Sequence, residues 1–381
     1  MQLVAYGAQD IYLTGNPQIT FFKVVYRRHT NFSMESIEQT FNGNANWGKK
    51  VSCTISRNGD LIHRVYLQTT LPAVDVGSGN TFNWNSWVGH QLVKNVEVEI
   101  GGQRIDKHYG EWLHLWNELS QSPGLQEGYA RMVGNTTGLT FASQSTSETT
   151  LYIPLQFWFC RNPGLALPLI ALQYHEVKVN VEFNELSKCH TKSTGAVVSN
   201  ADLKNTSLFV DYIYLDTDER RRFAQVSHEY LIEQVQFNGK TCLGQKDSCA
   251  NIELRFNHPC KELVWVVQDG RIVGDTINEP FGFAADTNLG KDDFVKSAVL
   301  QLNGHDRFTA RDRLYFTRTQ IWQHHTGYGG VTLADTIAVY SFALKPEEHQ
   351  PAGTCNCSRI DTAQLTQTGT ARALEVYAVN Y

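Results

Sequence analysis

The chain has 381 residues, of which 19% are charged and 11% are aromatic, and its formal net charge at pH 7 is −5. A long disordered tail is excluded, because such tails need more charge and fewer aromatic side chains. We also expect no direct binding of nucleic acid, since the longest basic run is Arg220–Arg222 and a phosphate backbone is normally bound by a clustered basic surface.

Eight cysteines are scattered along the chain, and none of them forms a Cys-x-x-Cys pair. The N-terminus has neither the charged segment nor the long apolar segment of a secretory signal, so we expect reduced cysteines and a cytosolic protein. No apolar run approaches the ~20 residues that a membrane span requires. We therefore expect no direct membrane insertion, and any association with a membrane would go through partner proteins.

Two stretches of the first half return in the second half. Ile37–Gly43 resembles Ile232–Gly239, which has one residue more, and the strand-like run Val93–Gly102 matches Val295–Gly304 with the same apolar face. Solenoid repeats are about 20 to 50 residues long, so a repeat with this much longer period indicates two complete domains. Each half of the chain is large enough to enclose its own hydrophobic core.

Regular patterns begin some distance into the chain. Residues 1–20 show no strong strand period. After the first copy of the duplicated strand, Trp112, Leu115, Trp116 and Leu119 are spaced as i, i+3, i+4 and i+7. This spacing places the four side chains on one side of a helix, so it predicts a short amphipathic helix.

Strand patterns dominate the rest of the chain. Val177–Phe183 alternates apolar with polar residues, and Ile252–Phe256 does the same in the second half. A period of two buries one face of a strand and exposes the other. Leu208–Val210 and Leu263–Val267 are continuous apolar runs, which are typical of strands covered on both faces. All four segments are predicted to belong to the core of a sandwich.

Long, turn-rich connections separate the predicted strands, and we expect them to act at the surface because connections this long are unusual inside a compact domain. They are residues 75–91, 123–150, 188–200 and 269–292. Asp216–Glu219 is acidic and Arg220–Arg222 is basic, an order that suits the dipole of a brief helical turn. We place the junction between the two domains at this turn.

The predicted fold class is all-β, with two tandem eight-stranded antiparallel jelly-roll β-sandwiches and long inter-strand loops. In a jelly roll, two sheets cover most of each other's apolar faces. The predicted domains are an N-terminal jelly roll with an N-terminal arm at residues 1–216 and a C-terminal jelly roll at residues 217–381. A short linker near residues 216–226 joins them.

Two classes of duplicated all-β enzyme can be tested against the sequence. Pepsin-like aspartic proteases need an Asp-Thr-Gly or Asp-Ser-Gly turn in each lobe so that two carboxylates share a proton, but every Asp-Thr pair here is followed by a residue other than glycine. Two-domain cupins hold a metal with a His-x-His pair, and the sequence has no such pair. We therefore expect no enzymatic activity, no catalytic residue and no cofactor.

Three short clusters are the remaining candidates for metal ligands: His324–His325, Cys189–His190 and Cys355–Cys357. Consecutive strand residues point to opposite faces, so His324 and His325 are not expected to share one ion. The two cysteine clusters lack the second pair of ligands that a closed tetrahedral site requires. We expect no metal site.

Four Asn-x-Ser/Thr sequons occur, at Asn31, Asn135, Asn205 and Asn356. Without a secretory signal, coincidence explains most of them. Asn135 lies in the long connection 123–150, so we expect it to be the most exposed of the four. It is the one candidate glycosylation site that we retain.

Four separated runs of residues carry a family resemblance: Gly7–Lys23, Leu215–Ala224, Asn257–Pro259 and Tyr340–Pro351. Together they closely resemble the major capsid proteins of the nucleocytoplasmic large DNA viruses, the first run at the start of those proteins and the last in their C-terminal signature. Long literal matches in four places are much more specific than one short motif, and these span nearly the whole chain.

The resemblance implies a double jelly roll that assembles as a homotrimer. Three chains with two similar barrels each would make a nearly six-sided capsomer, and six-sided blocks tile the facets of an icosahedral shell. The implied partners are other copies of the chain, neighbouring capsomers and minor capsid proteins. The implied location is the virion capsid, with assembly in the host cell cytoplasm.

One alternative function remains open at this point, a virion surface attachment or glycan-binding protein. Jelly rolls also build lectins, and the aromatic loop Phe82–Trp87 has side chains that could stack on sugars. The competing interpretation is that the tryptophans of this loop, Trp84 and Trp87, pack against the neighbouring barrel. We further predict that Met1–Thr20 lies along the inner side of a shell and contacts a neighbour or a minor protein.

Overall fold

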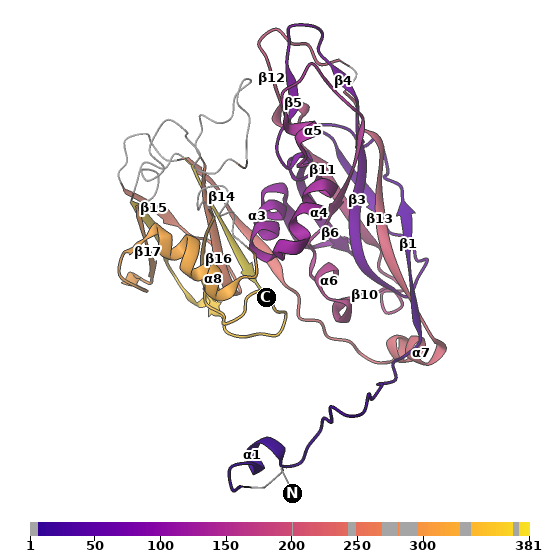
Figure 1. Cartoon of the computed structure of the whole chain (residues 1–381), viewed down its shortest axis with the longest axis vertical. Coiled ribbons are helices and arrows are strands. Elements are labelled where there is room, and N and C mark those ends of the chain that lie inside the picture. Colours follow the sequence, from indigo (N-terminus) through magenta and orange to yellow (C-terminus); the bar gives the residue numbers. More distant parts are fainter. Residues whose placement is uncertain are drawn as a thin grey trace, which may run out of the picture.

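Two β-sandwiches stand side by side in the computed structural model, and an N-terminal arm extends away from them (Figure 1). The structure describes residues 7–199, 201–242, 249–268, 281, 296–327, 337–368 and 373–381. Within these ranges every pair of neighbouring strands is antiparallel. The arm leads into the first strand of the first sandwich.

The first sandwich consists of two sheets. Its strands are β1 Phe32–Gln39, β2 Lys50–Thr54, β3 Leu61–Leu71, β6 Val93–Ile100, β7 Gln103–Tyr109, β9 Thr149–Pro154, β10 Leu167–Pro168, β11 Val177–Phe183 and β13 Lys204–Leu215. Sheet 1A has the order β1-β13-β3-β10, and β9 also pairs with β3. Sheet 1B has the order β2-β11-β6-β7.

The second sandwich repeats this plan. Its strands are β14 Gln234–Cys242, β15 Cys249–Glu253, β16 Pro259–Gln268, β17 Ser297–Leu302, β18 His305–Asp306, β19 Arg311–Asp312, β20 Ile337–Ser341, β21 Cys355–Asn356, β22 Ala363–Thr368 and β23 Ala373–Asn380. Sheet 2A has the order β14-β23-β16-β20, with β21 also on β16, and sheet 2B has the order β15-β22-β17-β18, with β19 also on β17. In both A sheets the last strand of the sandwich lies between its first and third strands and pairs with both.

The duplicated sequence stretches occupy equivalent places. Ile37–Gly43 begins in β1 and Ile232–Gly239 runs into β14, and these are the first strands of sheets 1A and 2A. Val93–Gly102 contains β6 and Val295–Gly304 contains β17, the third strands of sheets 1B and 2B. The repeat that was visible in the sequence is therefore a repeat of the whole strand order.

Alternation along the strands matches burial. In β11 the side chains of Val177, Val179, Val181 and Phe183 are buried. One apolar cluster fills the first sandwich and another fills the second, where it includes Trp265 from the apolar run 263–267. A third cluster lies between the two sandwiches. Each sandwich thus has its own core, and the junction between them has a further one.

Helices connect the strands. They are α1 Ile11–Thr14, α2 Val88–Leu92, α3 Gly110–Ser120, α4 Pro123–Val133, α5 Thr137–Thr140, α6 Trp158–Arg161, α7 Thr217–Gln225 and α8 Gln320–His324. A π-helical turn, Tyr315–Thr319, leads into α8, and 3₁₀ turns occur at Pro163–Leu165, Leu186–Lys188 and Cys357–Arg359. The helix predicted from Trp112 to Leu119 is confirmed as α3. The predicted turn at residues 217–222 is also confirmed, because the Asp216 Oδ1 atom accepts a hydrogen bond from the Glu219 amide at 2.9 Å and caps α7.

The prediction of a turn-rich connection at 123–150 was wrong, because this segment contains α4 and α5. Pro123 occupies the start of α4, where the missing amide proton costs nothing, and Gly134 ends that helix with φ 92°. Proline and glycine were read as turn residues, although at these two positions they begin and end a helix. The connection 269–292 lies outside the described residues except for Phe281.

Two other long connections form a projection at one end of the first sandwich (top of Figure 1). β4 Val74–Asp75 pairs with β8 Ser145–Thr146, and β5 Phe82–Trp84 pairs with β12 His190–Lys192. These connections therefore have secondary structure of their own.

Candidate assembly surfaces

Helix α3 of the first sandwich covers sheet 2A of the second (Figure 1). Its apolar side, Trp112, Leu115, Trp116 and Leu119, is buried. These side chains share one cluster with residues from all four strands of sheet 2A: Val235, Val264, Val266, Ile337, Val339, Tyr377 and Val379. Burying a large apolar side chain stabilises a fold by about 1.5–3 kcal/mol, so this contact holds the two sandwiches together as one unit.

Aromatic rings determine the geometry of this contact. The Trp112 ring centroid is 5.6 Å from that of Tyr377, which in turn stacks on Phe237 at 4.7 Å. Tyr109, just before α3, lies 5.0 Å from Phe237. Aromatic pairs at these separations contribute beyond their buried area. The outer face of sheet 2A is therefore an aromatic and aliphatic platform on which α3 sits.

A group of charged side chains is buried beside the platform. The Glu233 carboxylate, only 5% exposed, contacts Lys261 Nζ at 2.7 Å, Arg161 Nη1 at 3.0 Å and His349 Nδ1 at 3.1 Å. Arg161 belongs to the first sandwich, and its guanidinium stacks on the Trp116 ring at 4.2 Å. This ion-pair group therefore connects the two sandwiches by charge as well as by packing. Its members are far apart in the sequence, which explains why no motif revealed them.

Hydrogen bonds also cross the junction. The Gln234 side-chain amide donates to the carbonyl of Ile105, and the Val235 amide donates to Asp106 Oδ1 at 3.5 Å. Burial raises the pKa of Asp106 to about 6, although the nearby Arg161 charge acts in the opposite direction. The first strand of the second sandwich is thus tied to β7 of the first.

Two carboxyl groups lie close to each other at the start of α3. Burial, and then the charge of Glu375, raise the pKa of Glu111 to about 7. Burial also raises the pKa of Glu375, which accepts a hydrogen bond from the Tyr377 hydroxyl at 3.2 Å. The junction therefore contains groups whose charge changes near neutral pH.

The end of α8 has a third set of charged groups. The His325 ring contacts Glu262 Oε2 at 2.9 Å and Glu347 Oε1 at 3.0 Å, and its side chain is fully buried. Burial lowers the pKa of His325, but the two carboxylates outweigh it and raise that pKa to about 9. His325 therefore fixes the end of α8 to β16 as a charged group at neutral pH.

The outer face of sheet 1A differs from that of sheet 2A, because aromatic side chains remain partly exposed there. Tyr66 stacks on Phe209 at 5.3 Å and lies 6.4 Å from Tyr152, which is 40% exposed. Met34 on β1 is 50% exposed. Polar groups surround these residues, and the Tyr66 hydroxyl is 3.0 Å from the Ser36 hydroxyl.

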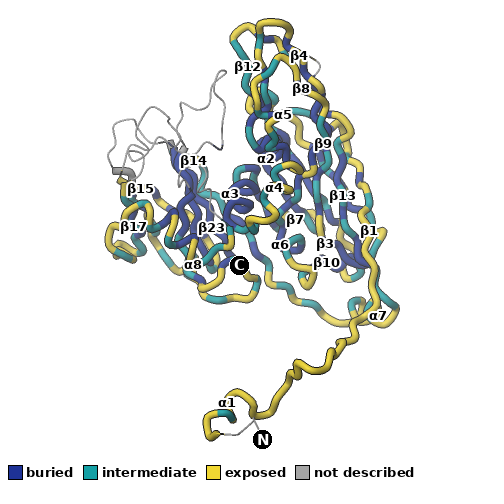
Figure 2. The backbone as a smooth tube through the Cα atoms, in the orientation of Figure 1, coloured by how far each residue is buried: buried dark blue, intermediate teal, exposed yellow. Residues whose placement is uncertain are grey.

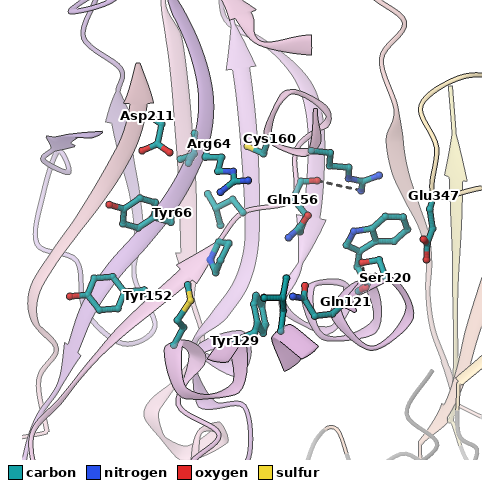
Figure 3. A pocket seen from close by; sticks show the side chains of 17 residues that line it. Arg64, Tyr66, Ser120, Gln121, Tyr129, Tyr152, Gln156, Cys160, Asp211 and Glu347 are labelled. Carbon is teal, nitrogen blue, oxygen red and sulfur yellow. Dashed lines mark hydrogen bonds between the residues drawn. The ribbon is translucent and has the colours of Figure 1, made fainter. Parts of the chain in front are cut away.

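A groove of about 810 Å³ borders this face (Figure 3). Arg64, Tyr66, Tyr152 and Asp211 line one side of it, and α3, α4 and Glu347 line the other. A rim that combines tyrosines with opposite charges is typical of a surface that contacts another protein. We treat the outer face of sheet 1A as an assembly surface.

Residues 7–31 of the N-terminal arm are almost entirely exposed (Figure 2). Nine large apolar side chains in this range are mostly exposed: Ile11, Tyr12, Leu13, Ile19, Phe21, Phe22, Val24, Val25 and Tyr26. The most exposed of them, Phe22, is 99% exposed. So many exposed apolar side chains in one segment mark a site of interaction with another molecule.

The aromatic loop Phe82–Trp87 is buried, which removes the basis of the glycan-binding alternative. Phe82 and Trp84 belong to the core of the first sandwich, where Trp84 stacks on Trp47 at 5.8 Å. Trp87 belongs to the cluster between the sandwiches, as the packing interpretation predicted for both tryptophans. For Trp84 that interpretation was wrong, because its ring lies in the core of its own sandwich. None of these three rings offers a face to a sugar.

Asn135 is not the most exposed of the four sequons, and that expectation was wrong. Asn135 is partly buried, whereas Asn31, Asn205 and Asn356 are exposed. The Asn135 amide bonds back to the Ala130 carbonyl at 2.8 Å where α4 ends. This closing turn holds Asn135 against the sandwich. Its glycosylation stays a prediction.

The candidate metal ligands have other contacts. His324 lies at the end of α8 rather than in a strand, with its Nδ1 atom 3.1 Å from the Leu344 carbonyl, while His325 contacts two carboxylates. Cys189 is buried, and the His190 ring contacts the Leu186 carbonyl at 2.8 Å. Among the described residues, no group of three or more His, Cys, Asp or Glu side chains is placed to hold a metal ion. In the same part of the chain, no helix is both long and apolar enough to cross a membrane.

Known protein families match both halves of the chain. The family described as major capsid protein N-terminus matches residues 20–216, and the family described as large eukaryotic DNA virus major capsid protein matches residues 219–379. The major capsid protein of Pyramimonas orientalis virus is 57% identical over 404 residues, which cover 100% of this chain and 95% of that protein. The major capsid protein of Paramecium bursaria Chlorella virus 1 is 45% identical over 389 residues, which cover 96% of this chain and 86% of that protein.

Solved structures of capsid proteins have a similar fold. A chain in the quasi-atomic model of the PBCV-1 virus capsid superposes with a TM-score of 0.79 at 36% identity, covering 95% of this chain and 96% of that one. The Faustovirus major capsid protein superposes with a TM-score of 0.80 at 11% identity, covering 99% of this chain and 94% of that one. At this identity the match shows a similarity of fold alone. The predicted all-β fold of two tandem jelly rolls is confirmed.

Proposed function

The chain belongs to the family of large eukaryotic DNA virus major capsid proteins, and we propose that three copies of it form one pseudo-hexameric capsomer of an icosahedral shell. The family resemblance noted in the sequence is confirmed. The role of the chain is structural, and its place is the capsid of the virion. The proposal extends this role to a defined assembly, the homotrimer.

One observation carries the proposal: two sandwiches with the same strand order are joined into one unit by α3 on sheet 2A. Two similar blocks in a fixed relation can act as two of six positions around a ring. Three copies related by a threefold axis then fill all six positions, and the particle approximates a hexagon. A threefold ring of this kind tiles a flat facet without needing six identical chains.

The domain boundary follows from the same reasoning. We place the N-terminal jelly roll and its arm at residues 1–216 and the C-terminal jelly roll at 217–381, with α7 in the linker near 216–226. This division is supported by the last strand of the first sandwich, β13, which ends at Leu215, and by the first strand of the second, β14, which begins at Gln234. The linker contributes no strand to either sandwich.

We assign the arm to contacts outside its own chain. It extends away from both sandwiches and exposes apolar side chains along its length, which supports a role in binding a neighbouring capsomer or a minor capsid protein on the inner side of the shell (Figures 1 and 2). Deleting residues 1–20 is expected to leave the trimer intact and to prevent normal shells, as seen by electron microscopy. Normal shells from the truncated chain would contradict this assignment.

Further assignments concern the viral genome, the place of assembly and catalysis. We propose that the capsid wall made by this chain does not bind the genome directly, in keeping with its net charge of −5 and the lack of a long basic run. We also propose that shells are assembled in the host cell cytoplasm without insertion of this chain into a membrane. The structural role of its relatives supports the expectation that the chain is not an enzyme.

The native mass of the purified full-length chain tests the trimer. One chain has a mass of 43.0 kDa, so native mass spectrometry is expected to give three times that value. Stable assemblies of this kind bury more than roughly 2,000 Å² in total, so the trimer is expected to survive dilution to micromolar concentration. A mass corresponding to one chain or to two chains would overturn the proposal.

A further inference from the structure

The contact between the two sandwiches is made by one helix and one sheet face, and each of these has an equivalent in the other sandwich. In the first sandwich, α3 follows β7 and covers sheet 2A. In the second sandwich, the π-helical turn Tyr315–Thr319 and α8 follow the equivalent strands β18 and β19. The sheet equivalent to 2A is sheet 1A, whose outer aromatic residues are partly exposed. Within the described part of the chain, α8 and the outer face of sheet 1A therefore remain for use between chains.

The helical segment 314–322 exposes two large apolar side chains, Leu314 and Trp322. Leu314, Arg318 and Trp322 follow one another at intervals of four residues, and all three are exposed. Trp322 is 82% exposed, while Phe316 and Ile321 on the other side of the segment are buried. A tryptophan exposed to this extent on an ordered helix is unusual, because large aromatic side chains are mostly buried in folded proteins.

The outer face of sheet 1A resembles the platform that α3 occupies. In sheet 2A the platform has a stacked pair, Phe237 and Tyr377, and Tyr377 lies on the last strand of its sandwich. In sheet 1A the stacked pair is Tyr66 and Phe209, and Phe209 likewise lies on the last strand. The neighbouring Tyr152 is partly exposed. Both A sheets thus have a stacked aromatic pair that includes the outer face of the last strand. Among the described residues, the pair in sheet 2A is covered by α3, while the pair in sheet 1A is partly exposed.

We propose that α8 of one copy docks on the outer face of sheet 1A of a second copy, with Trp322 packed against Tyr66, Tyr152 and Phe209. The docking surface and the helix lie on opposite sides of the molecule, with β1 at the far right and α8 on the left in Figure 1. A contact between two different surfaces is heterologous and either closes into a ring or continues as a filament. If the contact between chains repeats the contact within the chain, the ring closes after three copies.

Charged side chains surround the proposed docking surface. The outer face of sheet 1A has carboxylates at Glu38 and Asp211, and one cation, Arg64, lies near them in the groove. An aromatic centre with a polar rim is typical of a protein–protein interface. The inference rests on the proposed trimer and identifies the residues that form its interface.

Replacing the tryptophan tests the interface. In Trp322→Ala, the concentration at which half of the chains are trimeric, measured by sedimentation of the full-length chain, is expected to rise on the order of 30-fold or more, because a central tryptophan is a typical hot spot. Tyr174→Ala is the matched control, since Tyr174 is 94% exposed and lies on neither surface. Circular dichroism of both variants should equal that of the unchanged chain.

The outcomes separate this inference from the proposed function. If the unchanged chain is a single chain in solution, the trimer itself is wrong. If the unchanged chain is a trimer and Trp322→Ala is equally trimeric, the trimer stands and the assignment of α8 to its interface is overturned. An equal loss of trimer in Tyr174→Ala would also overturn the assignment, since the effect would then not be specific to α8.

A photo-crosslink locates the contact directly. Benzoylphenylalanine is introduced in place of Trp322, and the labelled chain is mixed with ¹⁵N-enriched chains before irradiation. Crosslinked peptides that join the two isotopic forms are expected to contain β3, β9 or β13. Crosslinks that reach only other peptides of the second chain, or only peptides of the same chain, would overturn the docking of α8 on sheet 1A.

Discussion

Helices α3 and α8 occupy the same place in the two jelly rolls and have opposite surroundings. In α3, Trp112 and Trp116 are buried against the other sandwich, whereas in α8, Trp322 is 82% exposed. A duplicated fold makes two copies of each surface, but one chain can pair only one helix with one sheet. The difference therefore separates the contact that stabilises the chain from the contact that remains available for assembly.

The largest effect is expected at the buried ion-pair group. Glu233→Ala should lower the free energy of unfolding by about 3–5 kcal/mol, because it leaves Lys261 and Arg161 without their carboxylate in a buried site. Denaturant unfolding measures this change. Glu253→Ala is the control, since Glu253 forms an exposed pair with Arg255 and its loss should cost at most ~1 kcal/mol. Equal effects of the two changes would show that the junction does not depend on this group.

Truncating one tryptophan in each helix tests the comparison itself. Trp112→Ala should cost about 3–5 kcal/mol of unfolding free energy, because it removes a fully buried side chain from the junction. Trp322→Ala should change that free energy by at most ~0.5 kcal/mol when both proteins are diluted to single chains. The contrast fails if Trp322→Ala destabilises the single chain as much as Trp112→Ala does.

The attachment of α8 is expected to depend on pH. The pKa of His325 rises from 6.5 to about 9 on folding, so its stabilising contribution is complete below pH 6.5 and is lost as pH rises through 9. The loss should reach roughly 3 kcal/mol, measured by unfolding between pH 6 and 10. In His325→Gln the share of this loss that comes from the histidine should be absent, so the fall in stability over this range should be smaller by roughly 3 kcal/mol. His29→Gln, a change of an exposed histidine in the arm, should retain it in full.

An effect of similar size, from a carboxyl group, is expected at α3. The pKa of Glu111 rises from 4.5 to about 7 on folding, so the contribution of Glu111 to stability is complete below pH 4.5 and is lost as pH rises through 7. Glu111→Gln should therefore be more stable than the unchanged chain by roughly 3 kcal/mol at pH 8 and show no advantage at pH 4. Glu127→Gln, on the exposed side of α4, should show no such difference between the two pH values.

Local patterns predicted much of the fold. The alternation in 177–183 predicted β11, the apolar run 263–267 predicted part of β16, and the spacing of Trp112 to Leu119 predicted α3. The duplicated stretches predicted two domains because equivalent strands must bury the same face. Residues 123–150 were misjudged, since Pro123 and Gly134 begin and end a helix there and a short segment has little periodicity to show it.

The assembly surfaces were harder to predict. Trp322 follows the second copy of the duplicated strand as Trp112 follows the first, so the repeat itself was a signal that a second helix would be found there. The exposure of Trp322 could not be predicted from the sequence, because tryptophan is usually buried. The ion-pair group around Glu233 had no signal at all, since Arg161, Lys261 and His349 are brought together only by the packing of two sandwiches.

The sequence by itself determined the family, the strand-rich fold and its duplication, because these depend on which residues follow one another along the chain. Only the tertiary structure decided which of two equivalent helices is buried, which aromatic face is left open and where carboxylates become buried next to cations. The physical reason is that burial depends on what packs against a side chain from distant segments. Two tryptophans in equivalent helices can therefore have opposite roles, one inside the chain and one at its surface.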